Sequence, residues 1–294
     1  MNRIDRLGLG DRVIILDGPM GTELHRRGVP TPPLGWSAHA LLTHPGVVRA
    51  IHDEYIAAGA DVITTNTFRT NARAIRNAGL GDMARQLTAT AVGIAREAAA
   101  AAGRRVLVAG SVAPVEDCYR PDLVPTDGEL QQEHAQLIGW LVEDGADLIK
   151  IETMNTLREA VAALNAARAL TDLPVLAGVV CGAGARLLSG EPVAEAARML
   201  EARGADAFMI NCSSVADTTA ALAAVAGATS MVLGAYANGG MPDPETWWSA
   251  ENMIGPGAYA TAAVTWHALG ARLIGSCCGT GPDHVAKLRL ITWE

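Results

Sequence analysis

Four copies of a short pattern, Gly-Ala followed by a charged residue and an apolar run, constrain the fold of this chain more than any other feature. The copies occupy residues 59–63, 145–149, 204–208 and 270–274. A glycine in the left-handed conformation after a helix, leading directly into a buried parallel strand, produces such a pattern. Successive copies begin 86, 59 and 66 residues apart, which leaves room each time for two strand–helix units.

Further predicted strands and helices fill the intervals between the copies. Four more apolar runs, at 13–16, 106–109, 175–180 and 231–235, bring the number of predicted strands to eight. Helices are predicted at about 81–102, 128–144, 155–170, 192–203, 214–226 and 257–269. No Pro/Ser-rich linker interrupts the alternation. We therefore predict an α/β fold, a single (β/α)8 TIM-type barrel in which residues 1–294 form one domain.

Three inserted segments follow predicted strands and are rich in Gly, Pro, Trp and Asp. They lie at residues 18–45, 112–127 and 238–256. Loops that follow the strands of such a barrel cover its C-terminal face, which is where barrel enzymes keep their active sites. We expect these segments to surround the functional site.

Composition and charge exclude several classes of partner. The net charge is −8 and no Lys/Arg-rich run is present, so we expect no nucleic-acid partner. The longest uncharged stretch, between Asp217 and Asp243, is broken by glycines and reads as helix, turn and strand, so we expect no membrane span. The charged N-terminus is unlike a signal peptide, which favours a cytoplasmic protein with free or metal-binding cysteines. The oligomeric state stays open.

Polar side chains occupy equivalent positions after the four repeats. Counting seven residues from each repeat glycine gives Asn66, Glu152, Asn211 and Cys277. Seven residues is about the length of a strand, so these side chains are expected at similar heights, at the C-terminal ends of the four even-numbered strands. The chemistry is therefore expected at this end of the barrel.

Three of the five cysteines, Cys212, Cys277 and Cys278, come from the ends of predicted strands six and eight. Neighbouring strands lie about 4.8 Å apart, so these two ends are roughly 10 Å apart, a gap that side chains can bridge to a metal with Zn–S bonds of about 2.3 Å. Three thiolates with an open fourth position are typical of a catalytic zinc site. The alternative is a set of small buried thiols. A Cys-Cys pair flanked by two glycines, in register with another strand-end cysteine, favours Zn²⁺.

The sequence resembles the homocysteine S-methyltransferase family almost from end to end. The matching motifs are LDGPMGTEL at 16–24, WSA at 36–38, GADVITTNTF at 59–68, IET at 151–153, NC at 211–212 and GSCCGT at 275–280. The resemblance implies that Cys212, Cys277 and Cys278 bind zinc and that the sulfur of homocysteine completes the tetrahedron. It also implies a methyltransferase of methionine biosynthesis with two small-molecule substrates.

Zinc binding would solve a definite chemical problem. A cysteine-like thiol has a pKa of roughly 8.5, so few molecules carry the nucleophilic thiolate at neutral pH. Coordination to Zn²⁺ removes the proton and holds the sulfur in place. The thiolate can then displace a methyl group in line from a positively charged donor. No catalytic acid or base beyond the activated substrate thiol is expected.

Five residues are candidates for binding the amino-acid part of the substrate. The resemblance implies that Glu152 is a partner for the substrate ammonium group and places Asp17, with the following Gly18, near the substrate. The alternatives are a structural carboxylate for Glu152 and an N-cap for Asp17, on a helix that begins around residue 22. Asn66 and Asn211 could orient substrate or satisfy loop backbone.

The methyl donor is expected to be an onium cation, which favours aromatic faces. Candidates for its pocket are Trp36, Phe68 and Tyr119. Asn238 is a further candidate, because residues 236–240 resemble the family's Pro-Asn-Gly loop with alanine in place of proline; a tight turn is the alternative. The two tryptophans at 247–248 are interpreted as packing anchors of their loop.

Several methyl donors and acceptors fit this reaction class. S-methylmethionine or S-adenosylmethionine is favoured, with betaine or a dimethylsulfonium acid as alternatives, and a different thiol or selenol acceptor is also open. A zinc hydrolase is disfavoured by three thiolates without histidine, and a non-catalytic zinc- or thiol-binding barrel leaves Asp17 and Glu152 unexplained. Cys118 and Cys181 are interpreted as free thiols.

Overall fold

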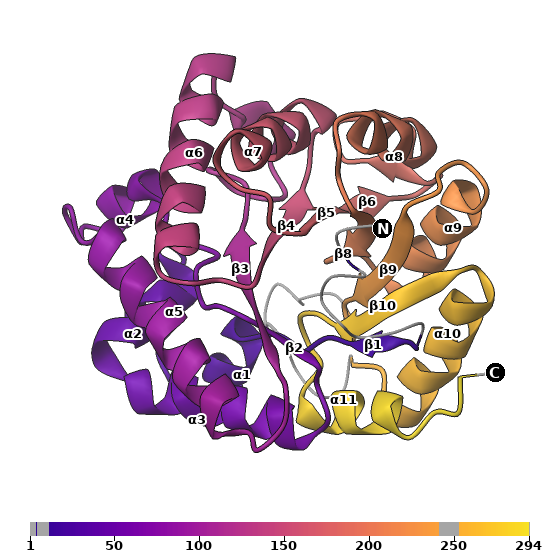
Figure 1. The fold of residues 1–294 in the computed structure, drawn as a ribbon, viewed down its shortest axis with the longest axis horizontal. Helices are drawn as coiled ribbons and strands as arrows, with labels where there is room; N and C mark the ends of the chain where they lie inside the picture. Colours follow the sequence, from indigo (N-terminus) through magenta and orange to yellow (C-terminus); the bar gives the residue numbers. More distant parts are fainter. Residues whose placement is uncertain (1–3, 5–11, 241–252, 294) are drawn as a thin grey trace.

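The computed structural model describes residues 4, 12–240 and 253–293. Eight parallel strands form the central sheet, in the order β1-β10-β9-β8-β5-β4-β3-β2. A parallel bridge between Leu16 and Val62 joins the first strand of this order to the last, and helices surround the strands (Figure 1). The strands are β1 Ile14–Ile15, β2 Val62–Thr64, β3 Leu107–Val112, β4 Leu148–Met154, β5 Val175–Val179, β8 Ala207–Asn211, β9 Val232–Ala237 and β10 Ala271–Ser276. The predicted (β/α)8 barrel is confirmed.

The predicted helices are also present, together with shorter ones that the sequence pattern did not reveal. The α-helices are α1 Gly21–Arg26, α2 Ala40–Thr43, α3 Pro45–Ala57, α4 Ala72–Asn77, α5 Ala84–Ala101, α6 Asp127–Glu143, α7 Leu157–Leu170, α8 Val193–Ala202, α9 Val215–Val225, α10 Pro256–Ala268 and α11 Pro282–Arg289. None of the described helices is long and apolar enough to cross a membrane.

A small antiparallel hairpin after β5 was not predicted. It consists of β6 Cys181–Gly182 and β7 Arg186–Leu187. Strands of two residues carry no alternating apolar pattern, so periodicity could not reveal them. Of the three predicted insertions, 18–45 and 112–127 contribute residues to the cavity described below. The third lies largely outside the described residues, and so do Trp247 and Trp248.

The repeat is explained by hydrogen bonds at the N-terminal end of the barrel. Its four glycines all have positive φ, between 85° and 104°, as the sequence pattern predicts. The aspartates of the first three copies each accept a hydrogen bond from a backbone N–H of the preceding barrel strand. These bonds are Ile15 N to Asp61 at 3.0 Å, Val108 N to Asp147 at 2.8 Å and Val175 N to Asp206 at 2.8 Å. Each of the first three copies therefore ties two consecutive barrel strands together, whereas the fourth has Arg272 in place of the aspartate.

Alternate residues of the strands enter two separate cores. Ile14, Leu16 and Leu148 belong to a cluster inside the barrel, whereas Ile15 and Ile149 belong to the layer between strands and helices. This alternation follows from the two-residue period of a strand. Side chains two residues after an interior position therefore point into the barrel as well.

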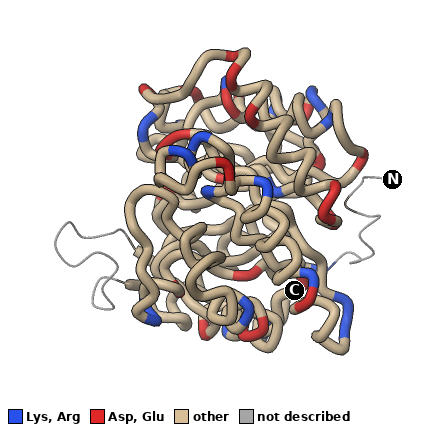
Figure 2. The backbone as a smooth tube through the Cα atoms, turned by 90° about the vertical axis from the view of Figure 1, so that its left-hand side faces the viewer, with Lys and Arg blue, Asp and Glu red and all other residues tan. Residues whose placement is uncertain are grey.

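Ion pairs join the outer helices to one another. In Figure 2, acidic and basic positions lie beside one another on the face that carries α4, α5 and α6. Arg85 of α5 pairs with Asp144 at 2.7 Å, and Arg73 of α4 pairs with Glu129 of α6 at 2.9 Å. Exposed pairs of this kind contribute little stability individually, so we assign the stability of the barrel to its two apolar cores and to the buried aspartates.

Removing a buried repeat aspartate should destabilise the barrel. Asp206→Ala leaves the Val175 N–H without its acceptor and Arg168 without its carboxylate partner. We expect a loss of about 2–4 kcal/mol in the free energy of unfolding, measured by urea denaturation. Asp53→Ala removes an aspartate–arginine pair from an exposed helix face and should cost less than about 1 kcal/mol. Equal costs for the two variants would contradict this role.

Candidate active site

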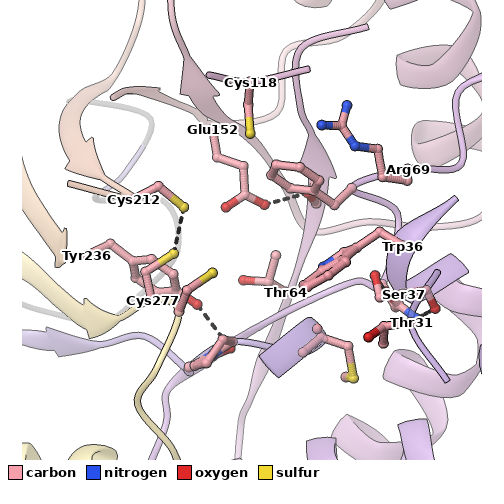
Figure 3. A pocket seen from close by; sticks show the side chains of 18 of the residues that line it. Thr31, Trp36, Ser37, Thr64, Arg69, Cys118, Glu152, Cys212, Tyr236 and Cys277 are labelled. Carbon is pink, nitrogen blue, oxygen red and sulfur yellow. Dashed lines mark hydrogen bonds between the residues drawn. The ribbon is translucent and has the colours of Figure 1, made fainter. Parts of the chain in front are cut away.

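A cavity of about 380 Å³ opens at the C-terminal end of the barrel. Its walls come from the loops after β1, β2 and β3 and from the ends of β4, β8 and β10 (Figure 3). Among the predicted site residues it is lined by Gly18, Trp36, Asn66, Phe68, Tyr119, Glu152, Cys212, Cys277 and Cys278. These residues are separated by up to 260 positions in sequence, and the barrel topology brings them to one opening.

The three predicted cysteines form a cluster at one wall of the cavity. Cys212 directly follows β8 and Cys277 directly follows β10, and their Sγ atoms are 2.8 Å apart (Figure 3). With Cys278, the three Sγ atoms all lie within 4.8 Å of one another. Cys212 and Cys277 are buried and Cys278 is half-buried. The expectation that strand ends six and eight meet through their thiols is therefore met.

The cluster has the donors and the size for a soft divalent metal. Tetrahedral zinc with bonds of about 2.3 Å places its sulfur ligands about 3.8 Å apart, within the span of these three atoms. Burial raises the pKa of the Cys277 thiol well above its usual range, and Cys278 and Glu152 nearby raise it further. Ionising these thiols without a cation is therefore unfavourable, and a metal that takes three thiolates would remove the difficulty.

Two strand-end residues beside the cavity, one of them the cluster residue Cys212, have a left-handed backbone conformation. Thr153 (φ 60°) and Cys212 (φ 53°) are non-glycine residues in this region, which costs of order 1–3 kcal/mol each. The Asn211 amide stabilises the first of them. Its Oδ1 accepts from Thr153 N at 2.9 Å and its Nδ2 donates to Thr153 Oγ1 at 2.6 Å. Asn211 is fully buried and does not line the cavity, so the structure assigns it to orienting the strand ends.

Asp17 lies at the end of β1, behind the cavity wall rather than among its lining residues. Its carboxylate accepts hydrogen bonds from Thr64 N at 2.6 Å, Thr64 Oγ1 at 2.9 Å and the Tyr236 hydroxyl at 2.9 Å. Burial raises the pKa of Asp17, although Lys150 opposes the rise. The alternative role as an N-cap is wrong, because α1 begins at Gly21 with Met20 as its cap residue.

Glu152 points from β4 into the cavity (Figure 3). One carboxylate oxygen accepts from Ser111 Oγ at 2.5 Å, and the other lies 3.1 Å from Lys150 Nζ. Both oxygens therefore already have a partner. Glu152 is 6% exposed and lines the same cavity as the cysteine cluster, as does Asp117, so either acidic side chain can meet a ligand there.

Lys150 is a buried charged residue of the cavity that sequence reasoning missed; Arg69 and Asp117 also line the cavity and were not singled out. It is buried, lines the cavity and holds its ammonium 3.7 Å from the centre of the Tyr236 ring. Burial lowers its pKa, but Glu152, Asp17 and Cys277 together raise it above its ordinary value. The signal was present in the sequence: a lone lysine interrupts the apolar run of β4 two residues after the interior Leu148.

The remaining polar candidates organise the loops around the cavity. Asn66 lines the cavity and bonds reciprocally with Ser37, whose Oγ donates to Asn66 Oδ1 at 2.6 Å. Gly18 also lines it, and a Cβ there would lie 2.6 Å from the Tyr55 hydroxyl, so only glycine fits. Asn238 is buried outside the lining and donates to the Cys212 carbonyl at 3.1 Å.

Aromatic side chains stand on the other walls. Trp36 and Phe68, two of the candidates for a donor pocket, line the cavity. Tyr119 also lines it, and its hydroxyl lies 3.4 Å from the Cys212 carbonyl. Tyr236, a residue that was not singled out as an aromatic candidate, is a fourth ring at the cavity. The site thus combines sulfur, charge and aromatic surface.

The two cysteines outside the cluster differ in position. Cys118 lines the cavity, and burial raises its pKa to about 11. Cys181 lies in the hairpin, where its Sγ contacts the Ser213 hydroxyl at 3.4 Å and burial raises its pKa to about 11 as well. Neither belongs to the cluster of three.

Comparison with known proteins identifies the family. Residues 14–291 match the homocysteine S-methyltransferase family. The chain is 30% identical to homocysteine S-methyltransferase YbgG of Bacillus subtilis, over 94% of this chain and 93% of that protein. The homocysteine methyltransferase MmuM of Escherichia coli superposes with a TM-score of 0.85 in its metallated form and 0.77 in its apo form. Both comparisons cover 98% of this chain and 99% of that structure, at 29% and 28% identity respectively. The chain belongs to the homocysteine S-methyltransferase family and is a methyltransferase.

Proposed function

We propose that the protein transfers a methyl group from a small onium donor to the thiol of L-homocysteine, giving methionine, and that Zn²⁺ held by Cys212, Cys277 and Cys278 is required. The observation that carries the proposal is the set of three thiol sulfurs within 4.8 Å of one another, at the wall of a cavity large enough for a ligand. The cavity leaves space for a fourth sulfur beside them. The family and the likeness to the metallated form of MmuM support it.

The reaction needs a thiolate and a cationic methyl donor. Bound zinc would lower the pKa of the acceptor thiol and hold its sulfur at the cysteine cluster. The acceptor sulfur attacks the methyl carbon, an S–CH₃ bond forms and the bond from that carbon to the onium centre breaks. The thiol proton leaves to solvent, and the donor departs neutral at that centre. The protein supplies position and charge rather than an acid or base.

The polar wall of the cavity would bind homocysteine, and the aromatic wall would bind the methyl donor. Glu152, with Asp17 behind it, would form the polar end that receives the amino-acid part of homocysteine, and Gly18 and Asn66 line the same cavity. Trp36, Phe68 and Tyr119 would present aromatic faces to the cationic donor. Asn211 and Asn238 act behind the site, through Thr153 and the Cys212 carbonyl.

The size of the cavity favours a small donor. Its volume of about 380 Å³ is near the lower end of the usual range for ligand pockets, roughly 300–1,000 Å³. Homocysteine and the donor must occupy it together. S-methylmethionine has far fewer atoms than S-adenosylmethionine, so we propose S-methylmethionine as the preferred donor. Betaine or a dimethylsulfonium acid as donor, and another thiol or selenol as acceptor, are outcomes that the assay below distinguishes.

Metal content should depend on the cluster and on no other cysteine. We expect one zinc per chain in purified protein, measured by plasma mass spectrometry, and less than a tenth of that in Cys277→Ser, since one of three thiolate ligands is lost. Cys181→Ser is the matched control, because this buried thiol lies outside the cluster and should keep full zinc. Equal zinc in the two variants would contradict the assignment.

Methyl transfer should follow the same pattern. Zinc-loaded protein is incubated with homocysteine and each donor separately, and the methionine that carries the donor's isotopically labelled methyl group is quantified. We expect most product with S-methylmethionine, a loss of at least about a thousandfold in kcat/KM for Cys277→Ser, and activity within about threefold of the parent for Cys181→Ser. No labelled methionine from any donor would overturn the proposal and favour a non-catalytic metal-binding barrel.

A further inference from the structure

Arg69 is a cation at the cavity that the sulfur chemistry does not use. It follows β2, is half-buried and lines the cavity. The other basic residue of the lining, Lys150, is paired with Glu152 at 3.1 Å. Arg69 forms no ion pair with any carboxylate within residues 4, 12–240 and 253–293. A guanidinium without an acidic partner at a ligand cavity is suited to an anionic group of the ligand.

One nitrogen of the Arg69 guanidinium anchors the side chain to the loop after β3. Nη1 donates to the carbonyl oxygens of Pro114 at 3.1 Å and Glu116 at 2.6 Å. Nε and Nη2 donate to no other group in the part of the chain that the structure describes. These two nitrogens form one edge of the planar guanidinium, and such an edge bonds both oxygens of a carboxylate at once.

The loop that carries Arg69 is held by buried hydroxyl groups. Thr67 Oγ1 donates to the Ser111 carbonyl at 2.8 Å, and Thr70 Oγ1 accepts from Thr88 Oγ1 at 2.8 Å. Thr67 and Thr70 are fully buried. The backbone of Arg69 is thus fixed at one end of the side chain, and the Nη1 contacts fix the other. Little conformational freedom is lost when such a side chain binds a ligand.

The acidic groups nearby leave the positive charge of Arg69 available. Glu116 pairs with Arg73 at 3.2 Å. Asp117 lines the cavity too, but this residue is exposed and forms no ion pair with Arg69, so water screens its charge. A ligand carboxylate at Arg69 would therefore meet a positive charge that no acidic group of the described chain already neutralises.

Aromatic surface lies directly beside this positive charge. The Arg69 guanidinium carbon is 5.0 Å from the centre of the Phe68 ring. Figure 3 shows Arg69 and Trp36 on one side of the cavity and Cys212 and Cys277 on the other. A donor that binds between them presents its onium group to the aromatic faces. A carboxylate a few bonds from the onium group would then bind at Arg69.

We propose that Arg69 binds the carboxylate of the methyl donor. The donor class is then the onium carboxylates, in which one end of the molecule carries the methylated cation and the other end a carboxylate. Onium cations that lack the carboxylate are expected to be poor donors. This inference rests on the proposed function, because it takes the aromatic wall as the donor site. It adds to that site a specificity-determining residue.

S-methylmethionine and its carboxamide test the inference. The two molecules have the same chain, which ends in a carboxylate in one and in a neutral amide in the other. Their dissociation constants are measured by calorimetry with zinc-loaded protein and no acceptor thiol. We expect the carboxylate form to bind at least about tenfold more tightly, as hydrogen bonds between two charged groups allow. Similar affinities for the two forms, or no binding of either, would overturn the inference.

Arg69→Gln should remove this preference. The affinity ratio of the two forms should fall to within about threefold, because the carboxylate loses its cationic partner. Arg69→Lys keeps the charge without the planar pair of donors and should retain a smaller preference than the parent protein. Arg76→Gln is the matched control: it removes an exposed arginine of α4 and should keep the parent's ratio. An unchanged ratio in Arg69→Gln would overturn the inference.

The ratio of affinities separates ligand binding from a structural role of Arg69. Arg69→Gln also loses the Nη1 contacts, which can shift the loop after β3. Such a shift would weaken the carboxylate and carboxamide forms alike and leave their ratio unchanged. Thermal unfolding and zinc content are checked before binding is measured. If Arg69→Gln does not fold, Arg69→Lys decides, and an undiminished preference in that variant would contradict the role of Arg69.

The binding measurement also separates this inference from the proposed function. A preference for the carboxylate form that depends on Arg69, without labelled methionine in the transfer assay, would retain the inference as a binding site for onium carboxylates and reject methyl transfer. Labelled methionine formed by a protein whose preference does not depend on Arg69 would retain methyl transfer and reject the inference.

Discussion

The site depends on the mutual neutralisation of ionisable groups that the barrel buries at one end. Three thiols, the carboxylates of Asp17 and Glu152 and the ammonium of Lys150 lie within or directly behind one cavity. Isolated charges there would cost several kcal/mol each, so each group needs a partner. Lys150 lies 3.1 Å from Glu152 and its charge also acts on Asp17 and Cys277, but one ammonium cannot neutralise two carboxylates and three thiolates. A divalent cation at the cysteine cluster would supply the missing positive charge, which is why we propose that position for the metal.

Hydrogen bonds at the opposite, N-terminal end of the barrel fix the relative positions of the strands that carry the site. Asp61, Asp147 and Asp206 each tie a strand to the backbone of the preceding one, and so the heights of the strands relative to one another are set there. The heights at which β8 and β10 end, and with them the positions of Cys212 and Cys277, follow from that register. Close to the site, the Asn211 amide holds Thr153 in its unfavourable backbone conformation. Stability and chemistry thus occupy opposite ends of the same strands, as is usual for this fold.

The strands and the cysteine cluster could be predicted from the sequence, because both depend on the spacing of residues along the chain. The repeat and the apolar runs located all eight barrel strands, and counting along them placed Cys212 and Cys277 together. Contacts between side chains of different strands were beyond that reasoning: for Asn211 two roles were open, orienting substrate or satisfying backbone groups, and the structure shows its amide bonded to Thr153. Lys150 was missed because the run around it was treated as uniformly apolar. An ionisable residue at an interior position of a buried strand marks either a functional group or its counterion, and Lys150 is both paired with Glu152 and part of the cavity lining.

The most direct test of the account is X-ray absorption spectroscopy at the zinc edge, on protein with and without homocysteine. Three protein thiolates and a substrate sulfur predict a shell that gains one sulfur when homocysteine is added, with all Zn–S distances at about 2.3 Å. The gain should be absent when a thiol-free analogue such as homoserine is added. A shell dominated by nitrogen and oxygen, or one that does not change on addition of homocysteine, would contradict the assignment of the cysteine cluster as the site where the acceptor sulfur is activated.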